Sequence, residues 1–183
     1  MIRPNVVGAA RTMIDEASSQ VLVGTVIDFP EGTGDWTKKL DEAKLAIENG
    51  ADELDYVINY EAFKKGEIEL VTNEIFACTS YGLQNDKVVK WIIETAALDS
   101  AQIAAITSLI KEVVTTKFPA DYHALVFVKS STGFYVAPNN APNGATPEAI
   151  EIMVSNSGPL SVKASGGVRN YEEALAMINL GQS

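Results

Sequence analysis

With 183 residues, 46% of them hydrophobic and 21% charged, the chain has the composition of a globular protein and not of a disordered or fibrous one. Its formal net charge is −10 and no stretch is rich in lysine or arginine, which argues against nucleic acid as a partner. It has no run of about 18 apolar residues and no signal-peptide pattern, so we expect no membrane association and a cytoplasmic protein.

The chain has one cysteine and one histidine. Cys78 alone excludes an internal disulfide and a cysteine-cluster metal site, and we expect it to pack inside a helix. His123 lies in a polar connection, where a surface position is expected. The sequence therefore offers no set of cysteine or histidine ligands for a metal centre.

Five short apolar runs predict β-strands. They are rich in valine and isoleucine and lack strict polar alternation, which is typical of parallel strands covered on both faces. The predicted strands are Val21–Ile27, Glu53–Ile58, Val88–Glu94, Ala124–Lys129 and Ser161–Ala164.

Longer amphipathic segments with capping residues predict helices between these strands. The helices and their expected capping residues are Val6–Ala17 after Asn5, Lys38–Glu48 between Thr37 and Gly50, Ile103–Val114 after Asp99 and Gln102, Glu148–Val154 after Thr146 and Pro147, and Tyr171–Asn179 between Asn170 and Gly181.

Strands that alternate with helices predict an α/β fold with a parallel sheet, either doubly wound or closed into a barrel. The Pro- and Asn-rich segment 137–143 is too short for a domain linker and is expected to be a surface loop beside the site. We therefore expect residues 1–183 to form one domain.

Two lysines close predicted strands, and small residues follow each one. Lys129 precedes Ser130-Ser131-Thr132-Gly133, and Lys163 precedes Ala164-Ser165-Gly166-Gly167. Burial disfavours the charged amine, and two neighbouring amines disfavour each other's charge further, which leaves a neutral nucleophile for a carbonyl group. The pattern therefore indicates Schiff-base chemistry; the alternative is that each lysine simply extends from the end of its strand to water.

Two acidic residues and a glycine pair complete the predicted site. Asp55 lies inside an apolar strand, where partnership with a lysine would offset its burial; a structural Asp–Lys pair without turnover is the alternative. Glu94 ends another strand and either orients a lysine or, as we favour, begins the next loop. Gly166-Gly167, before the helix capped at Asn170, is expected to bind an anion through backbone amides.

Five stretches together resemble the deoxyribose-phosphate aldolases, class I aldolases with a (β/α)8 barrel. They occur in the family's order across nearly the whole chain and are Gly24–Gly32, Gly50–Asp55, Lys90–Thr95, Val128–Phe134 and Val162–Arg169. The resemblance implies a TIM-barrel type of fold and reversible cleavage of 2-deoxy-D-ribose 5-phosphate to acetaldehyde and D-glyceraldehyde 3-phosphate.

The resemblance also implies roles for single residues. Lys129 would form the Schiff base, Lys163 would keep it neutral and share in proton transfer, and Asp55 would act with it through a water. Substrate and phosphate binding falls to a group of loop residues: Thr132, Gly133, Gly166 and Gly167. No metal or organic cofactor is implied; the expected partners are a sugar phosphate, an aldehyde and other copies of the chain.

The chain matches about five to six of the family's eight β/α units, since family members have further strands before the segment matching Met1 and after the one matching Gly181. Three interpretations follow: a fragment of a normal aldolase, which we favour; association with another copy that covers the open edges; or a short natural form without activity. The functional alternatives are another class I aldolase and a catalytically incomplete remnant that only binds sugar phosphate or a partner.

Overall fold

A parallel five-stranded sheet forms the centre of the computed structural model, which describes residues 1–137 and 143–181. The strands pair in chain order and are β1 (Gly24–Ile27), β2 (Glu53–Val57), β3 (Val88–Ile92), β4 (Val126–Lys129) and β5 (Ser161–Lys163). Parallel neighbours need a crossover connection, and helices supply it. The predicted α/β class is confirmed, and the carboxyl ends of all five strands lie at one end of the sheet.

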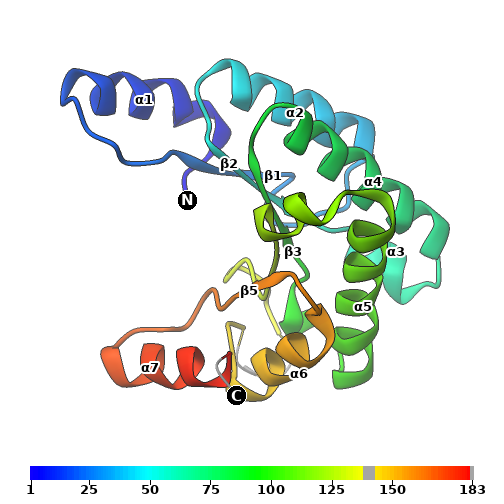
Figure 1. Cartoon of the computed structure of the whole chain (residues 1–183). Helices are drawn as coiled ribbons and strands as arrows, with labels where there is room; N and C mark the ends of the chain where they lie inside the picture. The colour runs from blue at the N-terminus through cyan, green and yellow to red at the C-terminus, as the bar shows by residue number, and fades with distance from the viewer. Residues whose placement is uncertain (138–142, 182–183) are drawn as a thin grey trace.

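The helices follow the strands in succession. They are α1 (Val7–Glu16), α2 (Trp36–Glu48), α3 (Tyr60–Lys64), α4 (Ile68–Gln84), α5 (Ser100–Lys117), α6 (Pro147–Ser157) and α7 (Tyr171–Leu180), with 3-10 helices η1 (Pro4–Val6), η2 (Thr95–Ala97) and η3 (Ala120–Leu125). Contacts run from α2 to α4, then to α5, α6 and α7, so these helices form one outer layer over the sheet (Figure 1). Figure 1 shows that the helices follow an arc, with α1 at one end and α7 at the other.

The sheet is an arc and not a closed barrel within the described residues, because the pairing runs from β1 to β5 without joining them. Ile2 makes an isolated parallel bridge to Thr25, on the edge of β1 that does not pair with β2. Neighbouring strands joined by outer helices are the construction of a (β/α) barrel. The described part of the chain therefore has the architecture of an incomplete barrel.

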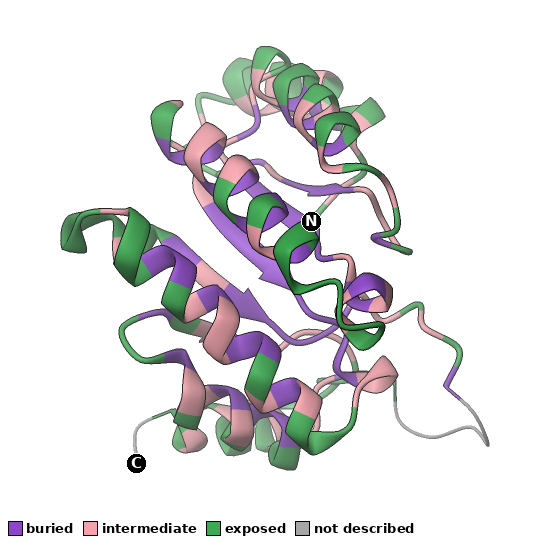
Figure 2. Ribbon diagram, turned by 90° about the vertical axis from the view of Figure 1, so that its right-hand side faces the viewer, coloured by how far each residue is buried: buried purple, intermediate pink, exposed green. Residues whose placement is uncertain are grey.

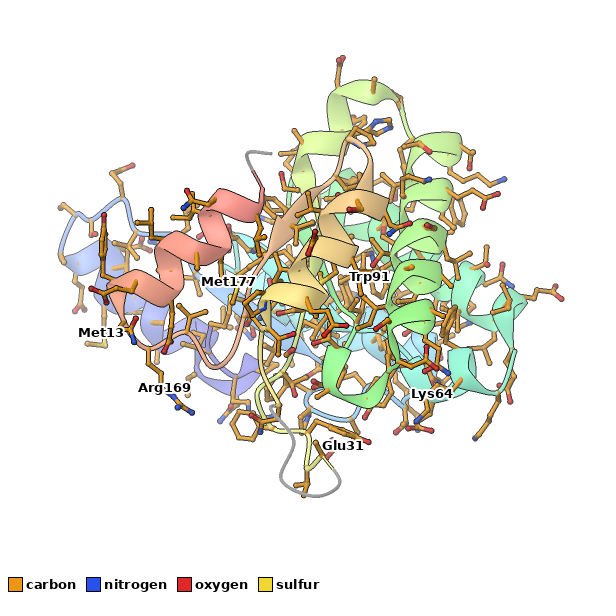
Figure 3. The ribbon with its side chains drawn as sticks, turned by 90° about the horizontal axis from the view of Figure 1, so that it is seen from below. Met13, Glu31, Lys64, Trp91, Arg169 and Met177 are labelled. Carbon is orange, nitrogen blue, oxygen red and sulfur yellow. The ribbon has the colours of Figure 1, made fainter. Side chains whose placement is uncertain are left out.

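The hydrophobic core lies between the sheet and the helices, where Figure 2 shows buried strands beside the buried faces of helices. Tyr56 and Trp91 stack there with ring centroids 5.2 Å apart, and the Trp91 ring nitrogen donates a 3.0 Å hydrogen bond to Oγ1 of Thr79. Figure 3 labels Trp91 among the side chains of the molecule's interior. Cys78 is fully buried in α4. The expected packing role of Cys78 is confirmed, and Trp91 packs in the same core.

Three of the predicted helix starts are confirmed. Asp99 and Gln102 form a complete capping box at α5, Pro147 occupies the first turn of α6, and the Asn170 side chain accepts from the backbone of Glu173 at α7.

Two other predicted caps are wrong. Pro4 begins a 3-10 turn that contains Asn5, so α1 starts at Val7 without a side-chain cap. The carboxylate of Asp35, and not Thr37, caps α2, because it accepts from the Thr37 backbone at 2.8 Å.

All five predicted strands were too long, by one to three residues. Val21 and Leu22 precede β1 and are 61% and 63% exposed, and Ala124 belongs to η3 and not to β4. Residues 138–142 of the predicted surface loop lie outside the described residues. Among the residues that the structure describes, no helix is both long and apolar enough to span a bilayer.

A buried lysine that the sequence did not indicate anchors the loop after β1. The Lys39 ammonium is fully buried and donates to the carbonyl oxygens of Gly32, at 2.9 Å, and Val57, at 2.6 Å. It also pairs with the buried Glu74 carboxylate on α4, and it lies 3.2 Å from Oδ2 of Asp28. Lys39 thus joins the β1 loop, the end of β2 and α4.

Candidate active site

The structure brings together Asp55, Lys129 and Lys163, the three residues with predicted catalytic roles. Lys129 and Lys163 are register partners at the carboxyl ends of β4 and β5. Lys129 Nζ lies 2.8 Å from Oδ2 of Asp55, and Lys163 Nζ lies 3.7 Å from the same oxygen. Two amines from neighbouring strands therefore share one carboxylate oxygen.

A third lysine occupies the other oxygen of this carboxylate. Lys90 Nζ lies 3.1 Å from Oδ1 of Asp55 and 2.6 Å from Oε2 of Glu53, and 5.9 Å from the centroid of the Phe127 ring. Lys90 was not among the site residues predicted from the sequence. The available signal was its place within the apolar run Val88–Ile92, the same kind of signal that singled out Asp55.

The three lysines differ in exposure. The Asp55 side chain is fully buried and that of Lys129 is 4% exposed, whereas 35% of the Lys163 side chain is exposed. Partial burial lowers the pKa of Lys163; the Asp55 carboxylate opposes this effect, and the positive charges of Lys129 and Lys90 add to it. Lys163 is therefore an accessible amine that loses its proton more readily than an ordinary lysine.

Glu94 binds the loop that follows the first lysine, and does not merely begin a loop as expected. Its side chain is buried, and Oε2 accepts hydrogen bonds from the backbone nitrogen of Thr132, at 3.1 Å, and from the Thr132 hydroxyl. Burial raises the pKa of Glu94, and these two hydrogen bonds oppose that rise. Its φ of 55° is left-handed, a strained conformation for a residue with a side chain.

The neighbours of Glu94 hold the same loop through the main chain. The backbone nitrogens of Ile93 and Thr95 each donate a 2.9 Å hydrogen bond, to the carbonyl oxygens of Lys129 and Ser130. The Ser130 hydroxyl then bonds both the nitrogen and the carbonyl oxygen of Ser165. The loops after β3, β4 and β5 are thus joined around the lysine pair.

Glycines from two of these loops meet beside the lysines. A Cβ added to Gly144 would lie 2.5 Å from the Gly166 carbonyl oxygen and 2.9 Å from the Gly167 nitrogen, so only glycine fits there. Gly166 has a φ of 81° and approaches Gly133. The structure therefore gathers the predicted glycines Gly133, Gly166 and Gly167 and adds Gly144, which was not predicted from the sequence.

We see no metal centre in the described part of the chain, where no three or more His, Cys, Asp or Glu side chains group around a common point. His123 is partly buried instead of being a plain surface residue, and its Nε2 lies 3.1 Å from the Phe118 carbonyl oxygen. The chemistry that the site residues can perform is that of amines and carboxylates: nucleophilic attack on a carbonyl carbon and proton transfer.

Known proteins resemble this chain over nearly its whole length. It is 42% identical over 165 residues to a deoxyribose-phosphate aldolase of Metamycoplasma hominis, covering 90% of this chain and 68% of that protein. It is 39% identical over 181 residues to one of Thermococcus kodakarensis, covering 98% of this chain and 74% of that protein. No protein-family model matches the chain.

Solved structures agree with these sequence relatives. A putative deoxyribose-phosphate aldolase from Coccidioides immitis superposes with a TM-score of 0.81 at 34% identity, over 98% of this chain and 64% of that one. A tetrameric deoxyribose phosphate aldolase from Aeropyrum pernix gives a TM-score of 0.75 at 26% identity, over 98% of this chain and 68% of that one.

Proposed function

Because the chain belongs to the deoxyribose-phosphate aldolase family, we propose that it is a class I aldolase that reversibly cleaves 2-deoxy-D-ribose 5-phosphate to acetaldehyde and D-glyceraldehyde 3-phosphate. The observation that carries the proposal is the single oxygen of Asp55 approached by both Lys129 and Lys163. An aldolase of this class needs an amine nucleophile beside a group that moves protons, and this arrangement supplies both.

Lys129 is the proposed nucleophile. Its Nζ attacks C1 of the open-chain sugar and water leaves, which gives an imine. The C2–C3 bond then breaks: the C3 hydroxyl loses its proton and C3 becomes the aldehyde of glyceraldehyde 3-phosphate, while the electron pair of the bond forms the enamine of acetaldehyde. Protonation of the enamine carbon and hydrolysis of the imine release acetaldehyde and regenerate the amine.

Asp55 and Lys163 are the proposed proton carriers. Asp55 lies within direct hydrogen-bond distance of Lys129, close enough to exchange a proton with it. The lowered pKa of Lys163 makes its neutral form, which can accept a proton, more accessible than that of an ordinary lysine. Lys90 neutralises the far oxygen of Asp55, and we assign it the role of holding this carboxylate in place.

The glycines after β4 and β5 are the proposed phosphate site. Gly133, Gly166 and Gly167 have positive φ values; Gly144 packs against Gly166 and Gly167, and Gly133 lies beside Gly166. Exposed backbone N–H groups in such turns bind phosphate oxygens.

We also propose that residues 1–183 act as one domain, that the chain assembles into homo-oligomers, and that it acts in the cytoplasm.

Turnover of 2-deoxyribose 5-phosphate by the full chain tests the proposed function. Acetaldehyde should form in proportion to protein, and the K129M variant should lose this activity, whereas K65M, at an exposed lysine, should keep it. Acetaldehyde that bonds to the protein without any cleavage of the sugar phosphate would instead support the catalytically incomplete remnant.

A further inference from the structure

The hydroxyl of Thr132 has a fixed hydrogen-bond direction. A threonine hydroxyl has one proton to donate and two lone pairs that accept. Its proton goes to Oε2 of Glu94, the same oxygen that accepts from the Thr132 backbone nitrogen. The Phe134 backbone nitrogen donates to the Thr132 hydroxyl at 3.1 Å and occupies one lone pair. The hydroxyl therefore has one lone pair left to accept a hydrogen bond from a ligand, and it has no proton left to donate.

Glu94 is held in the position that fixes this direction. Its side chain is 1% exposed, and the flanking backbone nitrogens of Ile93 and Thr95 are bonded to the lysine loop. Its other carboxyl oxygen, Oε1, is buried and has no hydrogen-bond partner among the described residues. If the carboxyl takes up a proton, Oε1 is where it resides, because Oε2 already accepts two hydrogen bonds. The direction at Thr132 is then unchanged.

We infer that Glu94 is a positioning residue that makes Thr132 a pure hydrogen-bond acceptor toward the substrate. This inference rests on the proposed function and deepens it. A substrate hydroxyl can donate to the remaining lone pair of Thr132, whereas a phosphate dianion, which only accepts, cannot bind this side chain. Thr132 therefore selects for a hydroxyl on the substrate, and phosphate binding is left to the glycines.

The residue at position 94 can be changed without opening the tightly packed core. Glu94 lines a cavity of about 160 Å³ together with Tyr60, Phe134 and Tyr135. Methionine matches glutamate in length but has no strong acceptor, and glutamine keeps an acceptor oxygen while it removes the charge. E94M and E94Q thus separate the acceptor role from shape and charge.

The test compares binding of two isomeric ligands: 2-hydroxypropyl phosphate, whose hydroxyl can donate a hydrogen bond, and 2-methoxyethyl phosphate, whose ether oxygen only accepts. Dissociation constants come from NMR titrations of the wild type, E94M, E94Q, T132V and the E94M/T132V double variant. The wild type and E94Q should prefer the hydroxylated ligand by about tenfold, the usual effect of one satisfied hydrogen bond. E94M should lose this preference because the freed Thr132 proton can then be donated to the ether oxygen, and T132V should lose it because the hydroxyl is absent. E94M should have no further effect in the T132V background.

Several results would overturn the inference: equal binding of both ligands by the wild type, no binding of either, an E94Q variant that behaves like E94M, or a preference that survives in E94M. Reduction with borohydride in the presence of acetaldehyde is run on the same samples and reports imine formation separately. Imine formation without ligand preference refutes only the role of Glu94; ligand preference without imine formation refutes only the aldolase proposal.

Discussion

Lys129 Nζ lies 2.8 Å from Oδ2 of Asp55, and neither side chain is more than 4% exposed. Removing two charges from water is costly, and such buried pairs often add little to stability. Lys163 and Lys90 approach the same carboxylate, so one acid faces three bases. A cluster of this kind is typical of a functional site, where pKa shifts serve chemistry.

Replacement of Asp55 should disturb both stability and titration. D55N removes the carboxylate that three clustered lysine side chains share, and we expect the free energy of unfolding to fall by about 3–5 kcal/mol. The pKa of Lys163 should fall further, because Asp55 is the group that raises it most. Urea unfolding and an NMR pH titration of the lysine side chains measure the two effects. D15N, at an exposed partner of Arg11, is the control and should cost less than about 1 kcal/mol.

Lys163 should make the free energy of unfolding depend on pH in a defined direction. Its pKa in the folded protein is below the ordinary value of 10.5, so between these two pH values the unfolded chain binds more protons than the folded one. The contribution of Lys163 to the free energy of unfolding therefore increases as pH rises through this window. In urea unfolding from neutral pH upward, the wild type should gain stability relative to K163M. A relative loss would contradict the lowered pKa.

The buried ion pair of Lys39 and Glu74 should be essential to the fold. K39M leaves the buried Glu74 carboxylate and the carbonyl oxygens of Gly32 and Val57 without their donor. We expect the free energy of unfolding to fall by about 3–5 kcal/mol in urea denaturation. K64M breaks the exposed pair with Glu61 and should cost less than about 1 kcal/mol. Similar losses in both variants would refute the assigned role of Lys39.

Gly144 tests the proposed phosphate site. The Cβ of G144A would lie 2.5 Å from the Gly166 carbonyl oxygen, so the loops after β4 and β5 must separate. KM for deoxyribose 5-phosphate should rise about tenfold or more, because a displacement of about 1 Å is costly at a preorganised site, while imine formation with acetaldehyde should change little. G8A, whose Cβ would make only ordinary contacts, is the control. An unchanged KM would place the phosphate elsewhere.

The sequence predicted the sheet and the lysine pair because both depend on local pattern. Valine- and isoleucine-rich runs mark parallel strands, and the carboxyl ends of such strands meet at one edge. Lys129 and Lys163 closed two consecutive runs, so their pairing followed from the strand order. Asn5 and Thr37 failed as caps because neighbouring residues, Pro4 and Asp35, determine those turns.

Lys90, Lys39 and Glu94 show what the pattern could not predict. Lys39 lies on the buried side of α2 with Ala43 and Ala46, and its partners Glu74 and Val57 are distant in sequence. The bond from Thr132 to Glu94 likewise joins two loops. Contacts between distant segments decide whether a buried polar residue finds hydrogen-bond partners. The pattern of a single sequence does not reveal such contacts. Lys90 could have been predicted, since a lysine inside an apolar strand needs a partner as much as Asp55 does.

Reductive trapping of the acetaldehyde imine tests the central claim most directly. The protein is mixed with acetaldehyde, reduced with borohydride, digested and analysed by mass spectrometry. We predict N-ethyl lysine at Lys129, and none in K129M. N-ethyl lysine at Lys163 alone would reverse the roles of the two amines. Absence of the adduct from both lysines in a folded sample, or its even spread over surface lysines, would contradict the aldolase mechanism.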